Sequence, residues 1–310
     1  MDISIVVPLY NEAESLPHLA EWIDRVMKEH GFSYEVVMVD DGSKDGSWQV
    51  IEKLHESNAS YRGIKFRRNY GKSAALNTGF CAVEGDVVIT MDADLQDSPD
   101  EVPELFRMIK EEGYDLVSGW KKKRYDSKLA KNIPSKFFNG TTRLLSGIKL
   151  HDFNCGLKAY RRDVVKSIEV YGEMHRYIPV IAKWAGFNKI GEKVVQHRKR
   201  EFGVTKFGMN RFINGYLDLI SIMFMSKFGK QPMHFFGAVG SISFLVGFIA
   251  LVVVLILRMA SRISLTNSVW FYLSILFVLL GMMLFLAGFV SELVCRNSPT
   301  RNQYLIEKEI

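Results

Sequence analysis

Two long apolar stretches near the C-terminal end of the chain restrict its fold more than any other feature. Residues 235–257 and 269–291 each run for 23 residues without a charged side chain. As an α-helix, each stretch would be about 34 Å long, whereas the hydrocarbon core of a bilayer is about 30 Å thick. Helices buried in globular proteins rarely lack charge over such a length. The sequence therefore predicts two transmembrane helices.

The charges around these stretches predict how the chain lies in the membrane. The link between them, residues 258–268, is short, so we expect the segments before and after the pair on the same side. The flank before the first stretch is richer in positive charge than the link, which carries only Arg258 and Arg262. By the positive-inside rule, we expect the N-terminal part of the chain to face the cytoplasm.

The overall composition indicates the kind of partner. The 310 residues are 48% hydrophobic and carry a formal net charge of +6. These values fit an anionic membrane surface or an anionic substrate, and we expect no nucleic acid partner. The three cysteines, Cys81, Cys155 and Cys295, lie far apart without metal-ligand spacing. They argue against a disulfide framework and fit a reducing compartment.

Apolar runs alternate with helical patterns in the N-terminal part of the chain. Strands are predicted at residues 3–9, 34–39, 64–66, 87–91, 116–120 and 191–197, and helices at 15–29, 47–55 and 173–184. Such alternation is typical of a doubly wound, mostly parallel α/β sheet with right-handed crossovers. Ligands of these sheets bind at the carboxyl ends of the strands, so the residues that follow each strand are the candidate site.

The fourth predicted strand runs directly into an acidic cluster. Asp92 and Asp94 lie two residues apart, and Gln96 adds a neutral oxygen. Such hard oxygens suit Mg²⁺ or Mn²⁺, because these ions keep several waters and take substrate phosphates as ligands. The alternative is an acidic loop that caps the next helix, with Asp97 or Ser98 as the N-cap. Two other strands end in the same way, in Pro8, Tyr10 and Glu12 and in Asp40 and Asp41.

Four motifs in order resemble those of a known enzyme family. They are IVVPLYNE at 5–12, VDDGSKDGS at 39–47, NYGKSAALNTG at 69–79 and DADLQD at 92–97. Together they look like the signature of family-2 glycosyltransferases with a GT-A fold, and more narrowly of the polyprenyl-phosphate type. The resemblance covers roughly residues 3–210, and the membrane tail extends it. A set of four ordered motifs is far more specific than any single motif.

The resemblance implies a role for each matching residue. Pro8, Tyr10 and Glu12 would line the nucleotide pocket, Asp40 and Asp41 would bind the base, Lys72 would reach the ribose or diphosphate, and Asp92, Asp94 and Gln96 would hold Mg²⁺ or Mn²⁺ on the diphosphate. The chemistry of these side chains is consistent with the implied roles. A carboxylate can accept the imide N–H of a base, and a lysine binds phosphate as a point charge. For residues 40–43, the competing interpretation is a turn with a helix cap.

Basic residues after the fifth predicted strand are the candidate contacts of the acceptor. A charge run such as 121–125 usually forms a solvated face, but here basic and apolar residues interleave onward through about 128–147. This pattern predicts a segment at the membrane interface. The resemblance implies that it faces a lipid phosphate, with Arg124 and Lys131 as contacts. A second basic segment, with Arg200 and Lys206, would close over the diphosphate.

The remaining catalytic candidate is Asp152. In the resembled family, the matching segment begins with a proposed catalytic base, and Asp94 joins it in the catalytic set. A phosphate monoester is already mostly dianionic at pH 7, so the sequence leaves open whether Asp152 is a base or positions the acceptor. The residues at 154–158, NCGLK, depart from the family pattern, which leaves the sugar contacts undefined.

We therefore expect a membrane-anchored, metal-dependent, inverting enzyme. It would transfer one sugar from a nucleotide-diphosphate sugar, with UDP as the expected nucleotide, to a polyprenyl phosphate such as undecaprenyl phosphate at the cytoplasmic face of a bacterial inner membrane. The alternatives are a processive polysaccharide synthase and a non-catalytic membrane protein that binds nucleotide sugars or lipid phosphates. The apolar helix surfaces would also permit assembly into a homo-oligomer such as a tetramer. The expected parts are a GT-A domain at 1–209, an amphipathic helix at 210–230, two transmembrane helices within 231–295 and a cytoplasmic tail at 296–310.

Overall fold

The computed structural model divides into two compact units, Met1–Ile220 and Ser221–Ile310. It describes residues 1–122, 139–144, 146–198, 217, 220–221, 223–225, 228–229, 231–261 and 268–297. The candidate acceptor contacts Arg124 and Lys131, the candidate diphosphate contacts Arg200 and Lys206, most of the predicted amphipathic helix and the tail from residue 298 lie outside these residues.

The first unit is built on a seven-stranded sheet in the order β3-β2-β1-β4-β6-β5-β7. The strands are β1 (Ile3–Leu9), β2 (Tyr34–Asp40), β3 (Tyr61–Lys65), β4 (Val87–Thr90), β5 (Leu116–Trp120), β6 (Lys158–Arg161) and β7 (Ile190–Val194). Every pair is parallel except those of β6 with β4 and β5. The predicted doubly wound, mostly parallel α/β fold is confirmed. The antiparallel strand β6 was not predicted, because its four residues, KAYR, form no apolar run.

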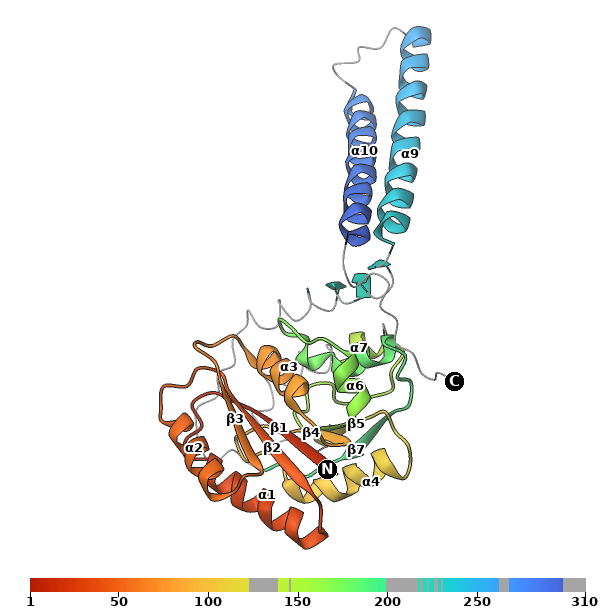
Figure 1. Cartoon of the computed structure of the whole chain (residues 1–310). Coiled ribbons are helices and arrows are strands. Elements are labelled where there is room, and N and C mark those ends of the chain that lie inside the picture. The colour runs from red at the N-terminus through yellow and green to blue at the C-terminus, as the bar shows by residue number, and fades with distance from the viewer. Residues whose placement is uncertain are drawn as a thin grey trace. The chain divides into compact units, whose positions relative to one another are not determined.

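Helices cover both faces of this sheet, with α1 and α4 on one side and α3 and α6 on the other (Figure 1). Their bounds are α1 (Leu16–His30), α2 (Ser47–Ser57), α3 (Lys72–Ala82), η1 (Pro99–Glu101), α4 (Val102–Lys110), α6 (Arg162–Ser167), η2 (Met174–Arg176) and α7 (Ile178–Trp184). Because both faces are covered, the central strands β1, β2 and β4 consist mainly of apolar residues and are almost completely buried.

Helix α1 illustrates how the local sequence sets an element. Leu16, Leu19, Ile23 and Val26 recur at helical spacing and are all buried against the sheet. The helix ends at Gly31, whose φ of 66° is a left-handed conformation that glycine adopts at little cost. The predicted helix over 15–29 therefore agrees with the structure to within one residue.

The strand register brings the polar strand ends to one edge of the sheet. Leu9 of β1 pairs with Asp40 of β2, and Val6 of β1 pairs with Thr90 of β4. Since these three strands are parallel, the residues that follow each of them emerge at the same edge. The acidic clusters that lie far apart in sequence are therefore neighbours in space.

The structure corrects two local predictions. Residues 173–184, expected as one helix, form η2 and then α7, because Pro179 lies in the first turn of α7 and marks a new helix start. Ser98 is at the N-cap position of η1, but neither it nor Asp97 caps that helix through its side chain. Asp97 is instead completely buried and pairs with Lys121.

The described part of the second unit contains two long antiparallel helices, α9 (Pro232–Ser261) and α10 (Val269–Arg296). Both are long and apolar enough to cross a membrane, and most of their side chains are exposed in the single chain. They pack along glycines: a Cβ on Gly281 of α10 would lie 2.4 Å from the backbone nitrogen of Phe244, and one on Gly247 of α9 would lie 2.6 Å from that of Val278. The two predicted apolar helices are confirmed.

Candidate active site

The loops after β1 and β2 are joined by hydrogen bonds at the carboxyl edge of the sheet. The backbone N–H of Asn11 donates to Ser43 Oγ at 2.8 Å, and that of Glu12 donates to Ser47 Oγ at 3.0 Å. Asn11 has a positive φ of 56°, which turns the chain sharply after Tyr10. This arrangement brings the predicted nucleotide-pocket residues Tyr10 and Glu12 beside the end of β2.

Asp40 and Asp41 hold loops in place as well as providing acceptors. Asp40 Oδ1 accepts the N–H of Ser43 at 2.8 Å, while its buried Oδ2 has no hydrogen-bond partner in the described part of the chain. Asp41 accepts the N–H groups of Tyr70 at 2.6 Å and Gly71 at 2.9 Å, which fixes the loop before α3. Burial raises the pKa of Asp41, although these two hydrogen bonds oppose the shift. Each carboxylate oxygen has two lone pairs, so Asp41 can still accept a further donor.

Lys72 is the first residue of α3, and its ammonium group pairs with Asp92. Burial opposes the ionisation of Asp92, but the positive charges of Lys72, Lys121 and Lys158 outweigh it and lower the pKa of Asp92 to about 2. Asp92 is therefore a carboxylate at any physiological pH. The structure places Lys72 on this carboxylate, beside the position where the sequence predicted a diphosphate.

The acidic loop after β4 has a strained backbone. Leu95 has φ of 59°, in the left-handed region that bulky residues seldom adopt, and its side chain is buried. The turn brings Asp94 back over its own loop, where Asp94 Oδ1 accepts the N–H of Gln96 at 3.2 Å. The backbone carbonyl of Gln96 accepts the N–H of Arg198. The surrounding structure thus fixes the loop in a conformation that it would not favour alone.

The residues present fit a divalent cation with few protein ligands. Asp92 and Asp94 supply hard oxygens, and Gly156 leaves the space that the Asp92 carboxylate fills, because a Cβ there would lie 2.5 Å from Asp92 Oδ2. In the described residues, no group of three or more acidic, histidine or cysteine side chains converges as a closed metal site. This set suits Mg²⁺ or Mn²⁺, which retain waters and bind substrate phosphates.

Asp152 lies in the loop before β6 and is 1% exposed. Its Oδ1 accepts the N–H of Asn154 at 3.0 Å. Cys155, three residues along, is also buried, and burial raises the pKa of its thiol to about 12, so it is not a nucleophile at neutral pH.

Lys121 lies beside the acidic loop and was not predicted from the sequence as a site residue. It follows β5 directly, its side chain is 12% exposed, and its Nζ lies 2.6 Å from Oδ1 of the fully buried Asp97. Burial alone would lower the pKa of Lys121, but the charge of Asp97 outweighs burial and raises it. The basic run at 121–125 therefore begins with a buried ion pair, not with a solvated residue. The rule that applied to β1, β2 and β4, that polar residues after a strand end belong to the site, would have found it.

The turn at η2 adds a second unpredicted group. His175 Nδ1 lies 3.0 Å from Ser73 Oγ, and the backbone N–H of His175 donates to the same oxygen at 3.1 Å. These contacts fix the turn against the start of α3, next to Lys72. His175, Arg176, Lys72 and Lys158 together line a small cavity of about 10 Å³.

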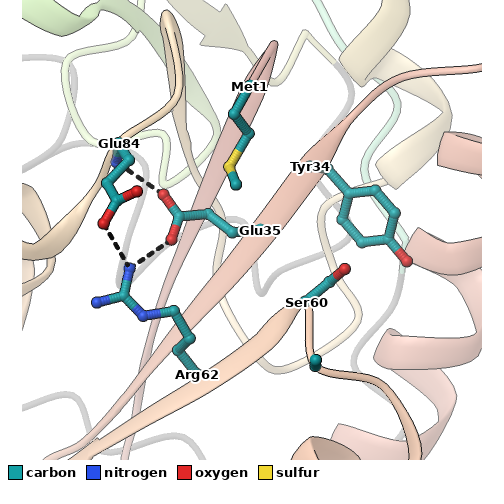
Figure 2. Close-up of a pocket in the computed structure, with 7 residues that line it drawn as sticks. Met1, Tyr34, Glu35, Ser60, Arg62 and Glu84 are labelled. Carbon is teal, nitrogen blue, oxygen red and sulfur yellow. Dashed lines mark hydrogen bonds and ion pairs between the residues drawn. The ribbon is translucent and has the colours of Figure 1, made fainter.

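A wider pocket of about 360 Å³ lies where the strands begin, at the opposite edge of the sheet (Figure 2). Its centre is Glu35, which accepts the Ser4 hydroxyl at 2.6 Å and the Glu84 N–H at 2.7 Å and pairs with Arg62 at 2.6 Å. Figure 2 shows Glu35 and Glu84 converging on the Arg62 guanidinium. The Glu35 carboxylate thus has the Ser4 hydroxyl, the Glu84 N–H and the Arg62 guanidinium as partners. We therefore interpret the polar residues of this pocket as a structural ion-pair network and not as the active site.

Comparisons with known proteins agree with the motifs. The model of Glycosyl transferase family 2 matches residues 4–169. The dodecaprenyl-phosphate galacturonate synthase of Rhizobium johnstonii is 36% identical over 242 residues, which cover 77% of this chain and 72% of that protein. The undecaprenyl-phosphate 4-deoxy-4-formamido-L-arabinose transferase of Photorhabdus laumondii is 33% identical over 99% of this chain and 94% of that protein.

Solved structures share the fold at low sequence identity. Glucosyl-3-phosphoglycerate synthase from Mycobacterium tuberculosis superposes with a TM-score of 0.55 at 18% identity, covering 73% of this chain and 80% of that chain. Mannosyl-3-phosphoglycerate synthase from Rubrobacter xylanophilus gives a TM-score of 0.59 at 14% identity, covering 73% and 75%. With the family model matching more than half of the sequence, the conclusion is direct: the chain belongs to glycosyl transferase family 2 and is a glycosyltransferase.

Proposed function

We propose that this glycosyltransferase transfers a single sugar from a nucleotide-diphosphate sugar to a polyprenyl phosphate, with inversion at the anomeric carbon. The observation that carries the proposal is the ion pair of Lys72 with Asp92 at the carboxyl edge of the sheet, where Asp94 lies in the same loop after β4. The start of β6 pairs with the end of β4, so the loop that carries Asp152 comes to this edge as well. Relatives named as dodecaprenyl- and undecaprenyl-phosphate sugar transferases support a lipid phosphate as acceptor. Undecaprenyl phosphate is the acceptor we favour.

A UDP-sugar is the donor that we favour. Pro8, Tyr10 and Glu12, at and after the end of β1, would contact the nucleotide. The carboxylates of Asp40 and Asp41, at the end of β2, would contact the base. A uracil imide N–H is a hydrogen-bond donor of the kind that a carboxylate accepts. The Mycobacterium tuberculosis synthase that shares the fold was solved with Mn²⁺ and UDP-glucose, which is consistent with this choice.

Mg²⁺ or Mn²⁺ would be held by Asp92 and Asp94, with Gln96 as a further oxygen donor. The cation would neutralise the charge that develops on the leaving diphosphate. Lys72 would contribute positive charge to the same group from the start of α3, and Arg200 and Lys206 would add theirs from outside the described residues.

The transfer would be one displacement. An oxygen of the acceptor phosphate attacks the anomeric carbon on the face opposite the leaving diphosphate. The new C–O bond forms there as the bond between the anomeric carbon and the diphosphate oxygen breaks. The nucleoside diphosphate leaves with the electron pair. Because the acceptor phosphate is already mostly dianionic at pH 7, the main task of Asp152 would be to orient it. Arg124 and Lys131 would bind the same phosphate.

The two apolar helices make this a membrane protein, and we propose that they anchor a catalytic part within residues 1–209 at the cytoplasmic face of a bacterial inner membrane. An acceptor with a polyprenyl chain lies in the bilayer, so an enzyme anchored there meets it by diffusion in two dimensions. The interface segment at 128–147, the amphipathic helix at 210–230, the cytoplasmic tail and assembly into a homo-oligomer belong to the same proposal.

A lipid-product assay tests the proposed reaction. Protein purified in detergent is incubated with undecaprenyl phosphate, Mg²⁺ and a panel of nucleotide sugars, and the lipid is analysed by mass spectrometry. We expect one product with a single added sugar, and its loss on addition of EDTA. A growing polymer, or nucleotide release without a lipid product, would contradict the proposal and favour a processive synthase or another acceptor.

A further inference from the structure

The backbone of Asp152 is held from both sides by side chains of two neighbouring strands. Ser118 of β5 donates its hydroxyl to the Asp152 carbonyl at 3.3 Å, and Glu192 of β7 accepts the Asp152 N–H at 3.0 Å. Ser118 and Glu192 are register partners in the parallel pair of β5 and β7, so their side chains stand next to each other on one face. Side chains of the sheet therefore hydrogen-bond to both the backbone N–H and the backbone carbonyl of Asp152.

Glu192 gathers three N–H groups of the 151–152 loop on one carboxylate. Besides the Asp152 N–H, Oε1 accepts the backbone N–H of His151 at 2.7 Å, and Oε2 lies 2.7 Å from His151 Nδ1. A carboxylate has no hydrogen to donate, so His151 Nδ1 is the donor of this bond. The Glu192 side chain is only 11% exposed. Hydrogen bonds to a carboxylate are about twice as strong as hydrogen bonds between neutral groups.

The carbonyl side of the same loop is fixed independently. Asn139 Nδ2 donates to the His151 carbonyl at 3.0 Å, and the His151 ring stacks on Trp120 with centroids 4.1 Å apart and planes 12° from parallel. The position of the loop along the sheet therefore depends on Glu192 for its N–H groups and on other residues for its carbonyls. Removing Glu192 would leave two adjacent backbone N–H groups without their acceptor.

We propose that Glu192 is a positioning residue that sets the place and direction of the Asp152 carboxylate at the acceptor phosphate. This inference rests on the proposed function. Glu192 is assigned no contact with the substrates and acts through Asp152 alone.

A simple surface ion pair between Glu192 and His151 does not account for the arrangement. The His151 side chain is 53% exposed, and pairs of that kind contribute little to stability. Two of the three bonds to Glu192 come from consecutive backbone N–H groups, one of them that of Asp152 itself. Such bonds define the path of the loop, which an ion pair at a side-chain tip does not.

Steady-state kinetics of Glu192→Ala and Glu192→Gln provide the first arm of the test. We expect Glu192→Ala to lower kcat by roughly ten- to a hundredfold, because small displacements of a reacting group have effects of that order. Glu192→Gln keeps one carbonyl oxygen and should lose less. The Kd for UDP, measured by titration calorimetry, should not change in either variant, because the proposed nucleotide contacts lie after β1 and β2 and at the start of α3. A matched control is Glu112→Gln, since Glu112 pairs with Arg107 away from the site.

A double-mutant cycle with Asp152→Ala provides the second arm. If Glu192 acts only through Asp152, adding Glu192→Ala to the Asp152→Ala protein should lower kcat by less than about twofold further. If the loss of kcat in the double variant equals the product of the losses in the two single variants, the inference is overturned. A Glu192→Ala protein with wild-type kcat would also overturn it. If Glu192→Ala does not fold, the same comparison is made with Glu192→Gln. A wild-type protein that forms no lipid-linked sugar would instead refute the proposed function, so the two failures are distinct.

Discussion

At the scale of single residues, the site depends on a missing side chain at Gly156 as well as on the acidic groups. Gly156 carries no Cβ, and the Asp92 carboxylate lies in the space that a Cβ would occupy. Three lysines surround this carboxylate and keep it ionised. A mutation in this region is therefore more apt to change the position of the Asp92 carboxylate than its protonation.

Gly156→Ala should move the Asp92 carboxylate without unfolding the protein. The added methyl group would lie 2.5 Å from Asp92 Oδ2, so the carboxylate must turn away. We expect kcat/KM to fall by about tenfold or more, because a displaced charged group no longer faces the reacting atoms. The control is Gly237→Ala in α9, where the three atoms nearest the added carbon belong to the flexible side chain of Met233. Equal activity of the two variants would contradict this description of the site.

Glu35 provides a residue-scale prediction about stability. Burial opposes its ionisation, but the hydrogen bonds from Ser4 and Glu84 and the charge of Arg62 outweigh burial and lower its pKa. A lowered folded-state pKa stabilises the fold above the unfolded value of about 4.3, and this stabilisation is lost as the pH falls through the folded-state pKa. Glu35→Gln should therefore lower the free energy of unfolding at pH 7 by about 1–3 kcal/mol, and by less near pH 4. Melting temperatures in detergent at the two pH values test this, and an equal loss at both would contradict it.

At the scale of elements, the sequence predicted best those that are determined locally. The strands β1 and β5 were predicted with their observed bounds, because a short run of mostly apolar residues can be recognised in the sequence without knowledge of the tertiary structure. The antiparallel strand β6 was missed, since only its neighbours β4 and β5 make KAYR a strand.

The same distinction holds within the candidate site. Asp92, Asp94, Asp40 and Asp41 follow apolar runs and could be selected from the sequence alone. Glu192 could not, because its importance arises from the register between β5 and β7, which places it beside Ser118. Polar residues inside a strand carry no signal of this kind until the partner strand is known.

The helix pair of the second unit depends on close approach at glycines. A Cβ on Gly281 would lie 2.4 Å from the Phe244 backbone nitrogen and 2.6 Å from the Gly240 carbonyl oxygen, both of which are immobile. We expect Gly281→Ala to destabilise the hairpin by about 1–3 kcal/mol, the usual cost of overpacking. Gly237→Ala is the control, because the three atoms nearest its added carbon belong to the flexible side chain of Met233. Equal melting temperatures for the two variants in detergent would show that the helices do not pack as described.

At the scale of the whole molecule, the charge distribution and the apolar helices together predict the topology. The link after α9 carries few positive charges, whereas the segment before α9 carries many. By the positive-inside rule, we expect the link outside and the sheet inside the cell.

Labelling of cysteines in intact cells tests this orientation. In a variant carrying Ser264→Cys in the link, a membrane-impermeant maleimide should label the new thiol from outside. The native Cys81, which is exposed on the first unit, should react only after lysis and serves as the internal control. Labelling of Cys81 in intact cells, with the link protected until lysis, would reverse the proposed topology.

The acidic residues at the carboxyl edge of the sheet are proposed to carry out glycosyl transfer to a lipid phosphate. The most direct test measures lipid-linked sugar formed by Asp94→Asn and Asp152→Asn against Asp163→Asn, an exposed aspartate on α6. We expect the first two variants to lose at least about a hundredfold in kcat, as removal of a group that stabilises a transition state does, and the control to keep wild-type activity. Wild-type rates in both site variants would contradict the account, since the reaction would then take place elsewhere on the molecule.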